Sequence, residues 1–192
     1  MTDSTREDNI LRDLRKEFFA FRNGIVADNL RKAGDPHPVI MGCLLIDLVT
    51  ITKQAIEAID DDARATVAQA LWDDIKSREC RLAAPMLYPS DLMTRETALQ
   101  WCETVETIEV ADNLCHKLLR NLKDADVLCH DLIASDKPMV KYTGYRLMLN
   151  LMRLEKLQAD DSLKAIVKSE YAHAQPPFTT LLRDVMEECQ GN

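Results

Sequence analysis

Helix-breaking residues divide the chain into short segments, and their positions constrain the fold more than any other feature. Between the breaks, apolar residues recur three and four positions apart, as in Ile10, Leu11, Leu14, Phe18 and Phe21, which is the spacing of one helix face. No alternation of apolar and polar residues lasts beyond a few positions. Glycine and aromatic residues are few, and good helix formers dominate the composition. The sequence therefore predicts an all-α protein.

The breaks also predict where the helices lie. We expect helices over residues 4–22, 25–32, 38–56, 60–75, 78–88, 94–103, 108–122, 124–134, 138–158, 160–174 and 178–189. Pairs of them recur roughly every 35 to 40 residues, which indicates a HEAT-like α-solenoid of antiparallel helix pairs. We expect residues 1–192 to form a single domain of this kind, with the inner helices lining a concave groove. A compact helical bundle is the alternative.

Several classes of protein are disfavoured by composition. No apolar run is long enough to cross a bilayer and the N-terminus is too polar for a signal peptide, so we expect a cytoplasmic protein without a membrane partner. In such a protein we expect the six cysteines to be reduced and mostly buried thiols. The pairs Cys115-His116 and Cys129-His130 do not indicate a metal site, because adjacent helical residues diverge by about 100°. Motifs for phosphate, dinucleotide or zinc binding are missing, so no metal and no cofactor is expected.

The charge of the chain is unevenly distributed. The net charge is −8, yet residues 117–156 contain eight Lys or Arg against five Asp or Glu. A local basic surface on an acidic protein is one interpretation of this excess. Ordinary solvated helix faces are the other.

Asp112 lies at an apolar position of the helix expected over residues 108–122. At about 100° per residue it falls on the stripe that carries Ile108, Cys115 and Leu119. A buried carboxylate costs several kcal/mol unless it is paired, hydrogen-bonded or protonated. We therefore expect Asp112 either to have a basic partner or to line a site that a ligand reaches.

The helix expected over residues 138–158 is apolar on almost every side and carries one polar stripe. We expect the cationic stripe of such a buried helix to contact a negatively charged group, which is a phosphate backbone, an anionic ligand or Asp112 itself. As partners of Asp112 we expect Arg146, Tyr142 or Lys141. The stripe consists of Tyr142, Thr143, Arg146, Asn150 and Arg153.

Four blocks of the chain resemble the AlkD family of DNA alkylation repair proteins, which have a HEAT-like helical fold. The blocks are AFRNGIVADNLRKAG, IMGCLLIDLVTITKQA, VAQALW with SRECRLAAPML, and TIEVADNLCHKLL. The resemblance runs from about Leu11 to Leu154. It rests on the order of the helices and on these short blocks.

This resemblance implies a glycosylase that releases N3- or N7-alkylated purines from duplex DNA held in a basic concave groove. It implies that Asp112 is the catalytic aspartate, which would stabilise positive charge on the sugar or orient a water molecule. The expected DNA-binding residues are Lys141, Tyr142, Arg146, Asn150 and Arg153.

The chain also departs from the family pattern at the expected site. Active members commonly carry a tryptophan one turn before the aspartate, where this chain has Ile108. In the later helix a tryptophan is followed by arginines, where this chain has Met139, Lys141 and Tyr142. The missing aromatic contacts to a cationic base are each worth on the order of 1 kcal/mol. Trp72 and Trp101 are expected to pack in the core instead.

Two functions from different classes are therefore carried forward. The first is a DNA alkylation repair protein, possibly a glycosylase, with duplex DNA as its partner. The second is a catalytically inactive helical-repeat module that binds a protein partner in the concave groove, a role that suits a net negative charge.

Overall fold

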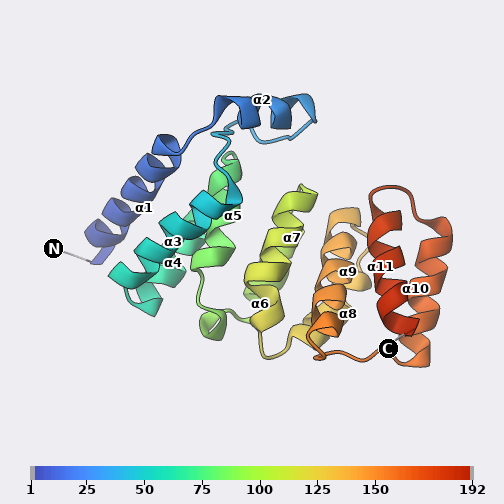
Figure 1. Ribbon diagram of the computed structural model, residues 1–192. Coiled ribbons are helices and arrows are strands. Elements are labelled where there is room, and N and C mark those ends of the chain that lie inside the picture. Colours follow the sequence, from blue (N-terminus) through green and yellow to red (C-terminus); the bar gives the residue numbers. More distant parts are fainter. Residues whose placement is uncertain (1–2, 191–192) are drawn as a thin grey trace. The chain divides into compact units, whose positions relative to one another are not determined.

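The computed structural model describes residues 3–190, and these form α-helices, two short 3-10 helices and no strands (Figure 1). The all-α prediction is confirmed. The chain divides into two compact units between Met93 and Thr94. Unit 1 contains α1 (Asp3–Ala20), α2 (Gly24–Lys32), α3 (Leu45–Ala58), α4 (Asp61–Asp73), α5 (Arg78–Leu87) and η1 (Ser90–Leu92). Unit 2 contains α6 (Arg95–Glu103), α7 (Ile108–Lys117), η2 (Leu119–Asn121), α8 (Ala125–Ile133), α9 (Pro138–Arg153), α10 (Asp161–His173) and α11 (Phe178–Gln190).

Most helices begin at a side chain that caps the first turn. Asp60 accepts a hydrogen bond from the amide of Ala63 at the start of α4, and Ser77 accepts one from Cys80 at the start of α5. Such caps satisfy amides that have no partner within the helix, typically at a gain of about 1 kcal/mol each. The same role is played by Asn23, Thr94, Thr107 and Asp160.

In unit 1, α5 packs against α3 and α4, while α1 covers both of those helices (Figure 1). α5 is buried along almost its whole length, including its charged residues. Trp72 is buried as expected, and the guanidinium of Arg81 lies 3.6 Å from the centre of its ring. The core of this unit includes Phe18, Leu48, Leu71 and Leu87.

The segment between α2 and α3 contradicts the prediction that Pro38 opens a helix. Residues 33–44 are not helical, and α3 begins only at Leu45. Val39 pairs instead with the chain before α5, because its amide donates to Lys76 and its carbonyl accepts from Arg78. Gly42 has a φ of +79°, and a Cβ there would lie 2.2 Å from the carbonyl oxygen of Asn23. Tertiary pairing and this glycine therefore override the helical spacing of the apolar residues.

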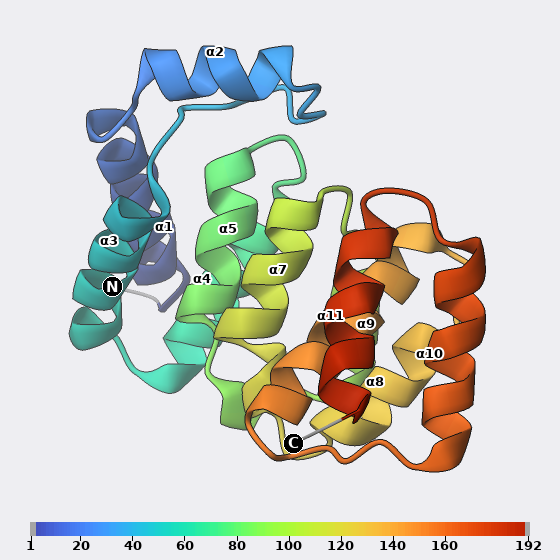
Figure 2. The ribbon, with the colours of Figure 1, turned by 45° about the vertical axis from the view of Figure 1, so that its right-hand side comes forward.

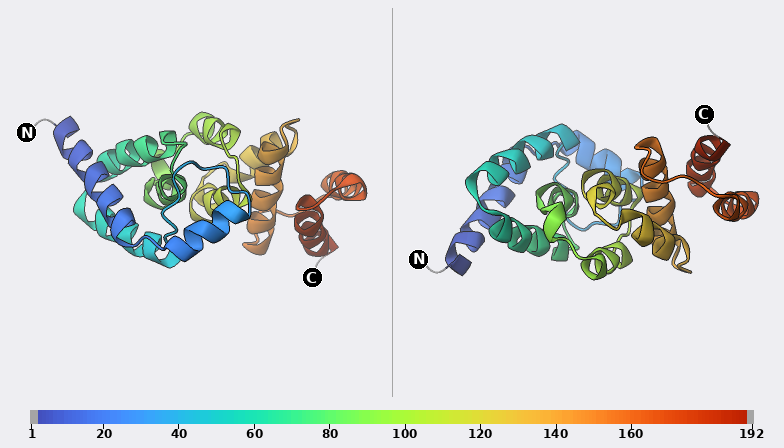
Figure 3. Two further views of the ribbon diagram at one scale, coloured as in Figure 1. Left: turned by 90° about the horizontal axis from the view of Figure 1, so that it is seen from above. Right: turned by 90° about the horizontal axis from the view of Figure 1, so that it is seen from below.

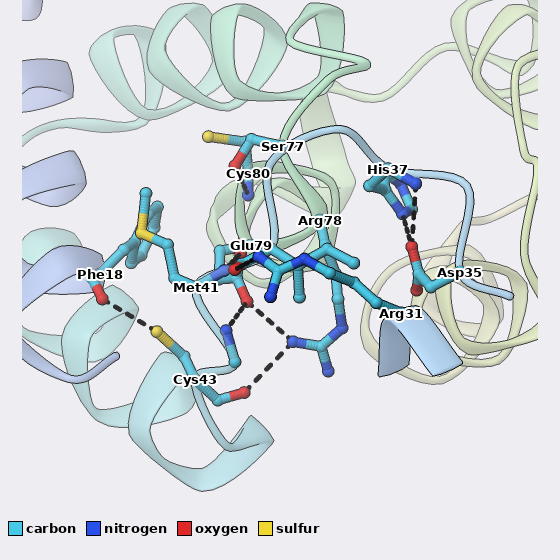
Figure 4. Close-up of polar contacts among 12 residues, drawn as sticks. Phe18, Arg31, Asp35, His37, Met41, Cys43, Ser77, Arg78, Glu79 and Cys80 are labelled. Carbon is cyan, nitrogen blue, oxygen red and sulfur yellow. Dashed lines mark hydrogen bonds and ion pairs between the residues drawn. The ribbon is translucent and has the colours of Figure 1, made fainter. Parts of the chain in front are cut away.

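A buried carboxylate holds this segment in place. Glu79, which has no exposed surface, accepts hydrogen bonds from the amides of Met41 at 3.0 Å and Gly42 at 2.9 Å (Figure 4). Arg78 donates to the same carboxylate at 2.9 Å and to the carbonyl of Cys43 at 3.3 Å. The charge of Glu79 is thus compensated within the fold, as a buried carboxylate requires.

In unit 2, α9 lies at the centre, in contact with α6, α7, α8 and α11. Figure 2 shows α11 running beside α9, and Figure 3 shows α10 and α11 paired at the C-terminal end of the chain. α9 is largely buried, as its apolar composition predicted. It begins at Pro138, which fits the first turn of a helix because it needs no amide partner there. Trp101 is buried in this unit, also as predicted.

Gly144 allows α9 to approach α8 closely, and this contact yields a first prediction. A Cβ at Gly144 would lie 2.7 Å from the amide nitrogen of Ile133 and 2.9 Å from the carbonyl carbon of Leu132. Because the obstacle is backbone, Gly144→Ala should lower the free energy of unfolding by about 1 to 3 kcal/mol despite the better helix propensity of alanine. Denaturant titration measures this. Gly24→Ala is the control, since nothing lies within 4 Å of its Cβ position; equal effects of the two substitutions would contradict the packing argument.

The six cysteines are all buried and free, which confirms the expectation of buried thiols. Burial raises the pKa of the Cys115 and Cys80 thiols, so these groups stay protonated near neutral pH. Within residues 3–190 no three His, Cys, Asp or Glu side chains gather as metal ligands would. None of the described helices is both long and apolar enough to span a membrane.

Candidate functional site

Asp112 on α7 forms a two-point ion pair with Arg146 on α9. Arg146 Nε donates to Asp112 Oδ1 at 2.6 Å, and Nη2 donates to Oδ2 at 2.9 Å. The hydroxyl of Tyr142, one turn earlier on α9, also donates to Oδ1 at 3.1 Å. A forked arginine contact fixes the plane of a carboxylate as well as its position. The expected pairing of Asp112 with Arg146 and Tyr142 is confirmed, and Lys141 lies elsewhere.

The pair is only partly buried, in contrast to the buried carboxylate that the helical stripe suggested. The side chain of Asp112 is 37% exposed and that of Arg146 is 25% exposed. Asp112 Oδ2 accepts one hydrogen bond from the described residues, whereas a carboxylate oxygen can accept two. The carboxylate therefore keeps acceptor capacity and a route to solvent while its orientation is fixed.

The local sequence explains why Asp112 faces α9. Thr107 caps the first turn of α7 through the amide of Val110. The opposite face of the helix is anchored by Ala111 and Leu114, which have no exposed surface. At the contact between the helices, Cys115 Sγ donates to the carbonyl of Thr143 at 3.3 Å. This contact sets the distance between α7 and α9 at the point where Asp112 meets Arg146.

Tyr142 is held from two sides. Its ring is 2% exposed and lies edge-on to Phe178, the first residue of α11, with 5.4 Å between the ring centres. Burial and the nearby Asp112 raise the pKa of the Tyr142 hydroxyl to about 12, so it remains a hydrogen-bond donor at any physiological pH. Burial alone would lower the pKa of Arg146, but Asp112 and Tyr142 raise it. Both side chains therefore keep the protons that they donate to the carboxylate near neutral pH.

Lys141 beside the predicted stripe and Arg153 at its end have acidic partners from the C-terminal helices. Lys141 Nζ lies 2.9 Å from Glu170 on α10, and Arg153 Nε lies 2.9 Å from Glu188 on α11. Between them, Asn150 has a buried amide nitrogen with no hydrogen-bond partner among the described residues. The stripe is therefore not a row of free cations, and only Arg146 of its basic residues meets Asp112.

A comparison with protein families matches most of this chain to a known family. A family model described as DNA alkylation repair enzyme matches residues 14–176 of the chain. The protein belongs to the DNA alkylation repair enzyme family. No curated protein and no solved structure matched the chain. The family match includes α7 and α9 and therefore the Asp112–Arg146 pair, and it confirms the resemblance on which the choice of Asp112 rested.

Three residues near the site were not anticipated from the sequence. Phe178 provides an aromatic ring beside Tyr142, and Glu170 and Glu188 pair with the basic residues nearest the two ends of α9. The only local signal for Phe178 is its place directly after Pro176-Pro177, where a helix starts. Charge pairing between separate helices leaves no signal in a single sequence, because it depends on how the helices pack.

Tyr142→Phe isolates the contribution of the hydroxyl to the orientation of Asp112. The substitution removes one hydrogen bond and leaves the Arg146 pair intact, so any base-releasing activity should fall only about 3- to 10-fold, which corresponds to roughly 1 kcal/mol. Because the folded-state pKa of Tyr142 is raised, its contribution to stability is complete below pH 10 and is lost as the pH rises towards 12. Denaturant titration at several pH values should show that the wild type loses stability faster than the variant across this window. If the stability of the wild type and of the variant falls equally with pH, the assigned hydrogen bond from Tyr142 to Asp112 is wrong.

Proposed function

We propose that this protein releases cationic N3- or N7-alkylated purines from duplex DNA. The observation that carries the proposal is the Asp112–Arg146 pair: a carboxylate fixed at two points yet more than a third exposed, in a member of the DNA alkylation repair enzyme family. A carboxylate held rigidly near a developing positive charge is an effective form of electrostatic stabilisation.

The proposed chemistry uses the positive charge that the lesion already carries. The bond between the sugar C1′ and the purine nitrogen breaks, and its electron pair leaves with the base, which becomes neutral. The sugar is left with oxocarbenium character, which the carboxylate of Asp112 stabilises. A water molecule then adds to C1′ and loses a proton to solvent, giving an abasic site. Arg146 holds the Asp112 carboxylate in its orientation throughout.

The remaining predicted residues are proposed to hold the DNA. Lys141 and Arg153 would exchange their carboxylate partners for phosphates, which is feasible because partly exposed ion pairs are worth only about 0 to 1 kcal/mol. Asn150 has a donor without a partner among the described residues, but it is buried, so its side chain would have to turn outward to reach a phosphate. Tyr142 is buried, so its proposed part is to hold Asp112. A HEAT-like solenoid that forms one domain over residues 1–192 and presents a concave groove would place these residues along the duplex.

Release of N7-methylguanine tests this function. The purified protein, in excess, is incubated with a duplex containing one N7-methylguanine, and the free base is measured by chromatography over time. We expect release well above the spontaneous rate, and none from an undamaged duplex of the same sequence. Release indistinguishable from the spontaneous rate would contradict the proposal.

A second candidate function is an inactive module that binds a protein partner. It is favoured by large apolar side chains exposed in unit 1, among them Ile25 at 77%, Ile46 at 65% and Phe19 at 56%, because such residues are typical of interaction surfaces when they gather. The net charge of −8 also suits a protein partner better than DNA. This alternative predicts a folded protein with no base release and no salt-sensitive DNA binding.

A further inference from the structure

A group of basic residues lies beyond the site, where α7 ends and η2 follows. We call it the basic corner and define it as His116, Lys117, Arg120, Lys123 and Lys156. Lys156 reaches across from the end of α9 and donates to the carbonyl of Arg120 at 2.9 Å. The proximity of the charges is also seen in the pKa of His116, which is lowered by burial and then by Arg120 and Lys117.

The Lys and Arg residues of the basic corner are gathered without acidic partners among the described residues, unlike the basic residues of α9 and of the segment just before it. Lys137, Lys141, Arg146 and Arg153 each form an ion pair with a carboxylate. Within residues 3–190, by contrast, no carboxylate forms an ion pair with the four Lys and Arg residues of the corner. The run from His116 to Lys123 contains no acidic residue, and the acids next to the corner in sequence are Asp124 and Glu155. An uncompensated cluster in a chain of net charge −8 needs an explanation outside the chain.

The corner continues the two helices that carry the site. Asp112 and His116 are four residues apart on one side of α7, and Arg120 follows in η2 after α7 has ended at Lys117. On α9, Arg146 contacts Asp112, and the residues after the end of this helix reach Arg120. α7 and α9 therefore run in the same direction from the Asp112–Arg146 pair to the corner. The amide nitrogen of Asn150, which has no partner among the described residues, lies one turn beyond Arg146 on this path.

The length of this path relates it to the spacing of DNA. Eight residues separate Asp112 from Arg120, which is roughly 12 Å along a helix at 1.5 Å per residue. Phosphates along one strand of B-DNA are about 3.4 Å apart along the axis. A strand whose damaged nucleotide lies at Asp112 would therefore carry its third or fourth phosphate past the corner.

We propose that the basic corner is a backbone-phosphate site, which binds the phosphates three and four nucleotides from the damaged base. Arg120 offers a planar guanidinium fork and the three lysines offer point charges, and both are typical phosphate ligands. The site contributes affinity and register and takes no part in base release. The inference rests on the proposed function, because it assumes that the damaged nucleotide lies at Asp112.

A triple variant, Lys117→Gln with Lys123→Gln and Lys156→Gln, tests the site through its salt dependence. Binding of a fluorescent duplex is measured between 50 and 200 mM salt. We expect the slope of log affinity against log salt to fall by about 2 to 3, since each phosphate contact contributes about 0.9. The control variant removes the same charge from exposed lysines elsewhere, at Lys53, Lys164 and Lys168, and should change the slope by less than about 1. Equal slopes for the two variants would overturn the proposal.

The position of the contact is tested with DNA in which single phosphates are replaced by neutral methylphosphonates. Replacement at the third and fourth phosphates on one side of the lesion should weaken binding to the wild type, and should weaken binding to the triple variant less, since that variant keeps only Arg120. Replacement at the eighth phosphate should weaken neither. A loss that is independent of position would overturn the proposal. If base release occurs normally while these results fail, the corner assignment alone is wrong; if the wild type neither releases base nor binds DNA, the proposed function is wrong.

Discussion

Asp112→Asn is expected to slow the release of N7-methylguanine about 100-fold or more. Loss of one positioned electrostatic group at a reacting centre commonly costs 100- to 1,000-fold in rate, or roughly 2.7 to 4 kcal/mol. The asparagine cannot carry the negative charge, and its amide nitrogen would meet the donors of Arg146. Because the DNA contacts proposed for Lys141 and Arg153 are retained, affinity for undamaged duplex should change less than about threefold. Single-turnover release and fluorescence titration measure the two quantities.

Asp131→Asn provides a matched control for this substitution. Asp131 on α8 accepts a hydrogen bond from Arg95 Nε at 2.7 Å, and its side chain is 33% exposed, close to the value for Asp112. It is thus an interhelical ion pair of similar kind in the same unit. Asp131→Asn should leave base release unchanged. If both substitutions slow release equally, Asp112 contributes through the stability of unit 2 and its proposed role is wrong.

Glu79→Ala should have the largest effect on stability. The substitution removes the carboxylate that lies 2.9 Å from Arg78, which is 4% exposed, and the acceptor for the amides of Met41 and Gly42. Removing one partner of a buried ion pair typically costs about 3 to 5 kcal/mol. Denaturant unfolding should therefore show a loss of this size. It should be accompanied by faster amide exchange in residues 38–43, since this segment is held by the same carboxylate.

Two further variants define what Glu79 contributes. Glu79→Gln keeps one acceptor oxygen and should lose less free energy of unfolding than Glu79→Ala. Glu57→Ala, at an exposed position of α3 in the same unit, should change stability by no more than about 0.5 kcal/mol. A Glu79→Ala variant as stable as Glu57→Ala would show that the segment is held by other contacts.

Much of the fold could be predicted because helix signals are local. Breakers and caps such as Ser77 and Asp60 act within a few residues, so the helical segments were correctly expected. Two helices end earlier than expected, α7 at Lys117 and α9 at Arg153, and the segment after Pro38 is not helical at all. There the apolar residues have helical spacing, but they are held by Glu79 and by pairing with residues just before α5, which lie more than 30 positions away. A contact of this range cannot be found from local spacing.

The candidate site was predictable in part for a similar reason. A carboxylate on one apolar stripe and a cation on another require each other, and this requirement led to Asp112 and Arg146. The partners of Lys141 and Arg153 were not foreseen, because exposed glutamates are common and carry no sign of pairing. Phe178 was not foreseen either, because its contact with Tyr142 depends on how α11 packs against α9.

The central claim is that the Asp112–Arg146 pair performs chemistry and is more than a bridge between α7 and α9. Asp112→Leu alone would strand Arg146 and should cost about 1 to 3 kcal/mol, less than for a fully buried pair because the carboxylate is partly exposed. The double variant Asp112→Leu with Arg146→Met replaces the pair by an apolar contact of similar size and should recover most of that stability.

Base release by this double variant is the most direct measurement, made beside the wild type at a temperature where both are folded. We predict that the wild type releases N7-methylguanine and that the double variant, although comparably stable, releases it at the spontaneous rate. A double variant that is as stable as the wild type and equally active would contradict the account, because the pair would then be a structural bridge alone.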